Sequence, residues 1–242
     1  ECAPFENVYT LALRGLHDRA MNASNDMGDR KDMLQEALMA QRQMLIDAIG
    51  KPGEEIPQAF TPYKEVLDVY DEGLELPDDV TIIWPDDNYG YMKRLSSPKE
   101  QKRSGRSGVY YHSSYLGKPH DHLWMNTVSP TLMYEELRKA YDATADRIWL
   151  LNAGDIKSCE FAVDYFLTMA FDIDAFNFER AANYRTEWLC GMLGDQYRNE
   201  YQDVVNSFYK LAFARKPEFM GWGYQWTTDK HGRERNTDTD FS

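Results

Sequence analysis

Five short apolar segments recur along the chain, and each is followed by polar residues and then by a stretch of helical character. They cover residues 7–13, 58–63, 80–84, 108–113 and 147–151. The third, Val80 to Trp84, is a run of apolar and β-branched residues, which is typical of a strand buried on both faces. Strands that alternate with helices form parallel sheets, because each helix returns the chain to the start of the next strand. We therefore expect an α/β fold.

The stretches between these segments predict helices at residues 29–49, 66–70, 97–103, 130–143 and 160–171. In the first of these, Leu34 and Leu38 fall on one face, and Gly50 predicts its end. Ser129 is expected to cap the fourth helix, with Pro130 at its first position. The short helix at 97–103 is predicted from a proline in its first turn.

The alternation stops at about residue 174. Residues 176–193 and 195–215 are interpreted as two helices separated by Gly194, and residues 227–242 as a polar loop. A closed barrel of this kind needs eight strand–helix units, and only five are present. The chain is thus either a smaller open sheet or a piece of a barrel whose first three units lie upstream, and the start at Glu1 instead of Met favours the second.

The predicted organisation follows from these patterns. Residues 1–173 are expected to form the C-terminal part of a (β/α)8 TIM-like barrel, and residues 174–242 the start of an α-helical domain with a polar tail. An open barrel exposes a strand edge and an apolar face, so this piece alone is expected to be inactive and poorly stable.

Charge and cysteine content exclude several classes of protein. The net charge of −13 argues against a nucleic-acid partner, and an anionic substrate would require a local cation. The three cysteines, Cys2, Cys159 and Cys190, form no metal or redox motif and no disulfide framework. No apolar run reaches the ~20 residues of a membrane span, and no signal peptide is visible.

Polar side chains that can act as acids, bases or ligands lie directly after the predicted strands. In a parallel barrel these strand ends lie on one rim, where active sites form. Carboxylates, arginine, amide, imidazole and phenol groups on one rim suit acid–base chemistry on a polyol. The candidates are Arg14, His17, Asp18, Tyr63, Glu65, Asp86, Asp87, Asn88, Tyr110, His112, Asn152 and Asp155.

Simpler roles compete with these assignments. Any single polar residue at a strand end is more often a loop or helix cap than a catalyst, and Asp86 and Asp87 suit a turn after Pro85. His120 and His122 could join these two carboxylates as metal ligands, but their spacing is not a specific metal signature. The functional interpretation rests on the joint occurrence of polar residues at five successive strand ends.

Several of these segments resemble the catalytic domain of glycoside hydrolase family 115, the xylan α-1,2-glucuronidases. The similar segments are Thr10 to Asp18, Pro62 to Val66, Trp84 to Tyr91, Gly108 to His112, Leu151 to Asp155 and Lys216 to Trp222. The resemblance covers nearly the whole chain. It implies removal of glucuronic acid, or its 4-O-methyl ether, from xylan with inversion at the anomeric carbon. It also implies an extracellular or periplasmic location, no cofactor, glucuronoxylan as the partner and a parent protein that can be homodimeric.

The resemblance carries the family's pocket residues onto Arg14, Asp18, Tyr63, Glu65, Asn88, Tyr110, His112 and Asn152. Asp87 is added as a substrate-binding candidate beside Asn88. Family members are longer, and their upstream barrel strands carry a further acidic pocket residue. The assignment of the general base is therefore open between Asp18 and that upstream acid.

Physical roles follow for three of these residues. Arg14 offers a planar fork that can hold a uronate carboxylate in two hydrogen bonds. Glu65 is the first choice for the general acid, and Asp18 for the carboxylate that supports the attacking water. Two alternatives stay open: a non-catalytic carbohydrate-binding or scaffold remnant, and a metal-dependent hydrolase that uses Asp86, Asp87, His120 and His122.

Overall fold

The computed structural model describes residues 5–15, 19–23, 26–117, 120–154 and 156–220, and the backbone alone at 227–228 and 234–235. The chain forms two compact units. Unit 1 comprises Glu1–Pro85, Lys93–Tyr110 and Ala140–Trp149, and unit 2 comprises Asp86–Met92, Tyr111–Lys139 and Leu150–Ser242. Within the described residues, no helix is both long and apolar enough to cross a membrane.

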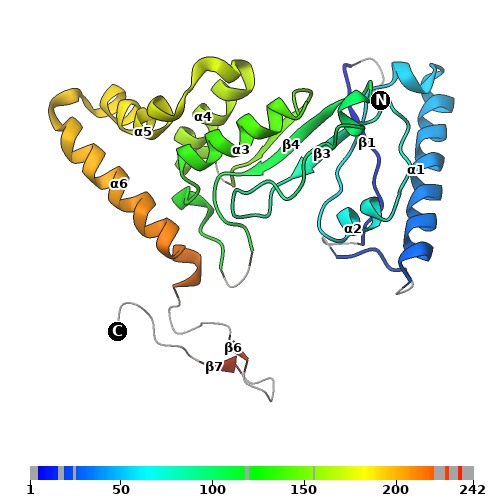
Figure 1. Ribbon diagram of the computed structural model, residues 1–242, viewed down its shortest axis with the longest axis horizontal. Coiled ribbons are helices and arrows are strands. Elements are labelled where there is room, and N and C mark those ends of the chain that lie inside the picture. Colours follow the sequence, from blue (N-terminus) through cyan, green and yellow to red (C-terminus); the bar gives the residue numbers. More distant parts are fainter. Residues whose placement is uncertain are drawn as a thin grey trace. The chain divides into compact units, whose positions relative to one another are not determined.

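Five strands form one sheet in the order β1-β2-β3-β4-β5. Figure 1 labels β1, β3 and β4 of this sheet. Their bounds are Tyr9–Thr10, Gln58–Phe60, Thr81–Pro85, Ser107–His112 and Trp149–Asn152. Neighbouring strands from β1 to β4 pair in parallel. Val109 and Ser113 donate their N–H groups to the carbonyls of Ile148 and Asn152, so β4 and β5 also run in the same direction. This sequential parallel order is that of a partial (β/α) barrel, as the sequence predicts.

The helices confirm most of the predicted ones, with bounds that shift by a few residues. The long first helix is α1, Met27–Ile49, and it ends at Gly50, whose φ of +72° is the left-handed conformation that favours glycine. Helix α3, Pro130–Asp142, starts after Ser129, whose hydroxyl accepts the N–H of Leu132 at 3.2 Å. The others are α2 (Glu65–Asp71), α4 (Glu160–Phe171), α5 (Phe178–Leu193) and α6 (Arg198–Ala214).

Two local predictions are wrong. Instead of a helix at 97–103 there is a 3-10 turn, η3, at Glu100–Lys102. Arg103 then donates hydrogen bonds to the carbonyls of Leu76, Pro77 and Val80, which draws the chain out of helical geometry. The tail expected to be loop contains a short antiparallel pair, β6 (Thr227–Thr228) and β7 (Glu234–Arg235). Strands of two residues are too short to leave a period in the sequence.

The core of unit 1 lies between the sheet and helices α1 and α2. Leu34 and Leu38 of α1 and Val66 and Val69 of α2 are buried in one cluster with Phe60 of β2. Every residue of β2 and β3 is buried, so the expected burial of β3 on both faces is confirmed.

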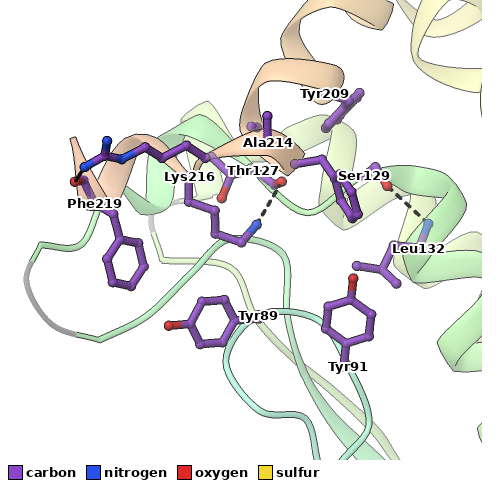
Figure 2. Close-up of a pocket in the computed structure, with 12 residues that line it drawn as sticks. Tyr89, Tyr91, Thr127, Ser129, Leu132, Tyr209, Ala214, Lys216 and Phe219 are labelled. Carbon is purple, nitrogen blue, oxygen red and sulfur yellow. Dashed lines mark hydrogen bonds between the residues drawn. The ribbon is translucent and has the colours of Figure 1, made fainter. Parts of the chain in front are cut away.

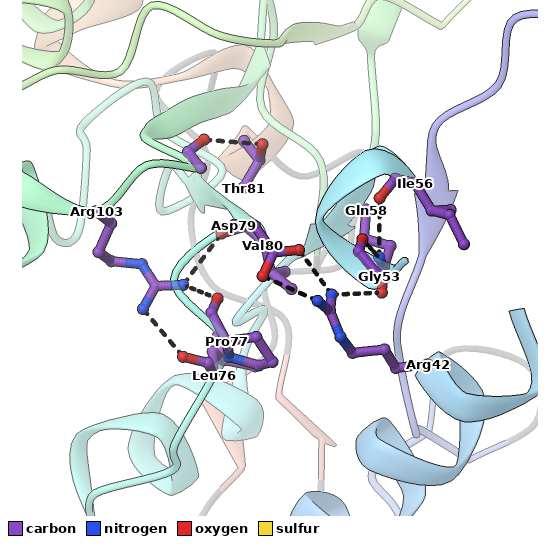
Figure 3. A network of polar contacts seen from close by, with 11 residues as sticks. Arg42, Gly53, Ile56, Gln58, Leu76, Pro77, Asp79, Val80, Thr81 and Arg103 are labelled. Atoms are coloured by element: carbon purple, nitrogen blue, oxygen red, sulfur yellow. Dashed lines mark hydrogen bonds and ion pairs between the residues drawn. The ribbon is translucent and has the colours of Figure 1, made fainter. Parts of the chain in front are cut away.

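Arg42 and Arg103 hold the loops before β2 and β3 in unit 1 (Figure 3), and the bonds of Arg103 to residues 76, 77 and 80 are those given above. Arg42 of α1 donates to both carboxylate oxygens of Asp79, at 2.7 and 3.0 Å, and to the side chain of Gln58 at 3.1 Å. Gln58 in turn donates to the carbonyls of Gly53 and Ile56. Because Gln58 opens β2 and Asp79 precedes β3, these charge-assisted bonds fix the amino ends of both strands.

In unit 2, α5 and α6 pack against each other after the chain turns at Gly194 (Figure 1). The guanidinium of Arg185 donates to the hydroxyl of Tyr209 at 2.5 Å and lies over the rings of Phe208 and Tyr209. The predicted helical pair is therefore present. The predicted domain boundary near residue 173 stays a prediction.

Gly108 in β4 is expected to tolerate no side chain. A Cβ at this position would lie 2.0 Å from the carbonyl oxygen of Ile148, beside β5. Gly108→Ala should therefore lower the free energy of unfolding by about 1–3 kcal/mol through overpacking. Gly191→Ala is the matched control, because Gly191 lies in α5 and a methyl group added there would have nothing within 4 Å. It should raise stability by about 0.5–1 kcal/mol. Thermal melting of both variants checks the opposite signs, and a harmless Gly108→Ala would contradict the close approach.

Candidate active site

The first group of predicted site residues lies in unit 1, in the loops that follow β1 and β2. Arg14 follows β1, Tyr63 follows β2, and Glu65 begins α2. Arg14 holds Glu65 in a two-pronged ion pair, with Nε to Oε1 and Nη2 to Oε2 both at 3.1 Å. Their side chains are 19% and 21% exposed, so the pair is partly shielded from water. The structure thus joins the two residues to which the sequence assigns separate roles as uronate ligand and acid.

Aromatic rings surround this ion pair. The guanidinium carbon of Arg14 lies 5.3 Å from the centroid of the Tyr63 ring, and the Lys64 ammonium lies 4.9 Å from the same centroid. Tyr63 meets Tyr110 of β4 edge to face, with ring centroids 6.0 Å apart. Unit 1 therefore brings together four predicted site residues: Arg14, Tyr63, Glu65 and Tyr110.

The second group lies in unit 2, where β4 ends and where the chain leaves β3. The Asp86 carboxylate contacts Nδ1 of His112 at 2.6 Å and accepts the backbone N–H of His112 at 3.1 Å. Both side chains are fully buried. A carboxylate at Nδ1 fixes the ring orientation and places the Nδ1 proton toward Asp86, which makes Nε2 the acceptor of the neutral ring. Asp86 is thus the partner that orients His112.

Asn88 and Asp87 shape a tight turn in the same unit. Asn88 has a φ of +67°, donates its backbone N–H to the Asp86 carboxylate at 3.1 Å, and donates its side-chain amide to the Leu116 carbonyl at 2.7 Å. The Asp87 carboxylate accepts the N–H groups of Tyr89 at 2.8 Å and Tyr91 at 3.1 Å. The turn chemistry considered for the two aspartates is therefore present, and one Asp87 oxygen is committed to it.

Unusual backbone conformations mark both strand-end loops. Lys64, which precedes α2, has a φ of +52° and a ψ of −122°, and Asn88 adopts the left-handed region after β3. Such conformations at residues other than glycine cost about 1–3 kcal/mol each and concentrate at ligand sites. At Lys64 and Asn88, the surrounding structure therefore holds the backbone in a conformation that the residue alone would not favour.

The remaining predicted residues are placed as follows. Asn152 ends β5, and its carbonyl accepts the N–H of Ser113 at 3.4 Å. His17, Asp18 and Asp155 lie outside the described residues. The rings of His120 and His122 are 6.1 Å apart. Within the described part of the chain, no three His, Cys, Asp or Glu side chains come together as a metal site. The metal-dependent alternative has no ligand set there.

Sequence reasoning missed two buried groups in unit 2. Tyr111, the neighbour of His112, donates its hydroxyl to the Gly90 carbonyl at 2.7 Å, and burial raises the pKa of Tyr111 well above its usual value. Glu218 is fully buried and accepts hydrogen bonds from the hydroxyls of Ser114 at 3.3 Å and Thr127 at 3.1 Å. Glu218 lies in the segment that carries part of the family resemblance, which is the signal that could have singled it out.

Comparisons with known proteins show the family of the chain. The family model of glycosyl hydrolase family 115 matches residues 1–219. A solved structure described as a family GH115 4-O-methyl-alpha-glucuronidase, BtGH115A, with specificity for decorated arabinogalactans, shares 42% sequence identity and a TM-score of 0.84. The match covers 90% of this chain but 29% of that one, so the chain spans under a third of its length. A comparison with curated protein sequences found no significant match.

Proposed function

Because the chain belongs to glycosyl hydrolase family 115, we propose that the complete protein removes glucuronic acid, or 4-O-methylglucuronic acid, from the main chain of xylan. The observation that carries this proposal is the two-pronged Arg14–Glu65 pair beside Tyr63. A guanidinium held in a carboxylate-binding geometry can hold the carboxylate of a uronic acid in the same way. Such a cation is what an anionic substrate needs on a chain with a net charge of −13.

The proposed reaction is an inverting hydrolysis. Glu65 donates a proton to the glycosidic oxygen as the bond to the anomeric carbon breaks, and a water attacks that carbon from the opposite face. Asp18 is the proposed base that takes the proton of this water. The alternative base is the acidic residue that family members carry in their upstream barrel strands. Asn88, Tyr110, His112 and Asn152, with Asp87 and Tyr63, are the proposed contacts to the sugar.

A second candidate substrate is a decorated arabinogalactan, which is favoured by the specificity described for the similar glucuronidase structure. The complete protein should be incubated with glucuronoxylan, with uronate-decorated arabinogalactan and with each polymer after removal of its uronates. Uronic acid release from one decorated polymer supports the proposal, and NMR of the first product formed should show the inverted anomer. Absence of release from both decorated polymers would reject the function, and a retained anomer would reject the mechanism.

Arg14→Lys is expected to weaken the use of substrate although the charge is kept. Lysine cannot form the planar pair of hydrogen bonds, and a charge-assisted bond contributes about 1.5–3 kcal/mol. The ratio kcat/KM should therefore fall by roughly 10- to 150-fold. Arg106→Lys is the matched control, because Arg106 forms the same two-pronged contact with Asp146 but precedes β4. Equal kinetics for Arg14→Lys and Arg106→Lys would exclude a substrate role for Arg14.

A further inference from the structure

Unit 2 contains a cavity of about 310 Å³ that the proposed reaction does not use (Figure 2). Loop 86–92 contributes Tyr89 and Tyr91, the residue before α3 is Ser129, and the chain after α6 contributes Lys216 and Phe219. Its volume is at the lower end of the ~300–1,000 Å³ of small-molecule sites. It therefore suits one sugar ring and not a longer segment of a glycan.

Aromatic rings form one side of this cavity. Tyr89 and Phe219 are stacked, with centroids 6.1 Å apart and ring planes 16° apart, and Tyr115 contacts both rings. Burial and a hydrogen bond with Tyr89 raise the pKa of Tyr115, so its hydroxyl stays neutral. Tyr91 is 42% exposed. Fixed and partly exposed rings of this kind offer apolar faces for the C–H face of a pyranose.

The opposite side of the cavity is cationic. Figure 2 shows Lys216 and Ser129 across from the two tyrosines, with the Lys216 ammonium bonded to the Thr127 carbonyl at 3.3 Å. The carboxylates of Glu218 and Asp87 act electrostatically on Lys216, but among the described side chains neither forms an ion pair with it. Burial lowers the pKa of Lys216, which indicates that its charge is only partly solvated. Arg215 adds a second cation to the lining. On so acidic a chain, this lining selects for an anion.

One turn connects this cavity with the Asp86–His112 pair of unit 2. The Asp87 carboxylate accepts the N–H groups of Tyr89 and Tyr91, and the same loop holds Asp86 and Asn88. Asp86, which positions His112, and the two tyrosines of the cavity thus belong to one hydrogen-bonded segment. This continuity favours an occupant that belongs to the polysaccharide substrate over an unrelated small molecule.

We propose that this cavity is an accessory subsite for a second carboxylate-bearing pyranose of the same polysaccharide. Its ring packs on Tyr89 and Tyr91, and its carboxylate faces Lys216. The inference rests on the proposed function, because that function supplies a polymer with several acidic side chains. It implies that the protein prefers densely decorated regions of its substrate.

The test uses the complete protein with Lys216→Met and Tyr91→Ala. Lys210→Met and Tyr197→Ala are matched controls, because both residues are exposed and lie outside the cavity lining. Calorimetric titration should use glucuronoxylan before and after removal of its uronates, with Glu65→Gln added to every variant so that the decorated polymer is not consumed. Lys216→Met should weaken binding to the decorated polymer at least ~10-fold, the effect of one charge-assisted contact, and leave binding to the neutral polymer unchanged. Tyr91→Ala should weaken binding to both.

Turnover separates this inference from the proposed function. On a uronosyl disaccharide, which cannot occupy two sites, Lys216→Met and Tyr91→Ala should keep the kcat and KM of the unsubstituted protein. Unchanged binding of the decorated polymer by both variants would overturn the subsite, and so would equal losses on the disaccharide and the polymer. If the unsubstituted protein releases no uronic acid at all, the proposed function fails, and the titration alone still decides whether the cavity binds acidic sugar.

Discussion

Glu65→Gln is expected to lower kcat on glucuronoxylan by about 10²- to 10⁴-fold, the usual contribution of a general acid. Glutamine preserves the size of the side chain and can still accept a hydrogen bond from Arg14, but it has no proton to give to the glycosidic oxygen. The loss should be far smaller on a uronosyl fluoride, because fluoride leaves without protonation. The variant should also lose the alkaline limb of the pH–rate profile. That limb reports deprotonation of the acid, since activity falls as pH rises through its pKa.

Steady-state kinetics on both substrates measure this difference. Glu72→Gln provides the matched control, because Glu72 is an exposed residue directly after α2 and should retain full activity. Arg14→Lys distinguishes a second possibility, in which Glu65 only holds the arginine in place. In that case Glu65→Gln and Arg14→Lys would slow xylan and fluoride hydrolysis by the same factor, and Glu65 would be a positioning residue for Arg14.

Features encoded by local sequence are predicted well. The end of α1 at Gly50, the hydroxyl cap of α3 at Ser129 and the bounds of α4 each depend on a few consecutive residues. The sequential parallel sheet follows from the alternation of apolar strands and helices, because such connections are geometrically restricted. The fold class can therefore be predicted from the sequence alone.

The partners of the site residues cannot be predicted in this way. Arg14 and Glu65 are 51 residues apart in the chain, and Asp86 and His112 are 26 apart. Position after a strand predicts that such residues share a rim, but not which carboxylate pairs with which cation or ring. The sequence offers Asp86 as a rim candidate, a turn residue or a metal ligand. Its carboxylate does accept the N–H of Asn88 in the turn, but its contacts with His112 could not be predicted.

Burial explains why the sequence analysis did not single out Glu218. Glu218 is 104 residues from Ser114 and is enclosed with it, although a lone glutamate near the end of a helical region is normally a solvated residue. Nothing in its immediate sequence encodes two hydroxyl partners. The failed helix at 97–103 has a similar cause, because the hydrogen bonds of Arg103 to the distant segment 76–80 override the local helical preference.

Trp84 is expected to be the most sensitive position for the stability of unit 1. Its side chain is fully buried in β3, the Arg94 guanidinium carbon lies 4.5 Å from its ring centroid, and Tyr70 meets it edge to face at 5.7 Å. Its indole N–H donates to Ser96 at 2.9 Å, and Ser96 donates to Ser107 of β4 at 3.0 Å. Removal of the ring would thus leave a cavity and break a hydrogen-bonded link to the next strand.

Trp84→Ala should therefore destabilise the sheet by about 3–5 kcal/mol, the cost of truncating a large buried aromatic residue. Trp84→Phe keeps most of the buried area and loses the N–H donor, so about 1–3 kcal/mol is expected. Trp124→Ala is the control, because that ring is 62% exposed and its loss should cost little. Hydrogen exchange of the β3 and β4 amides in the complete protein reports local opening directly. Exchange in Trp84→Ala should be at least ~100-fold faster than in Trp124→Ala, and similar rates in the two variants would show that the sheet does not depend on this ring.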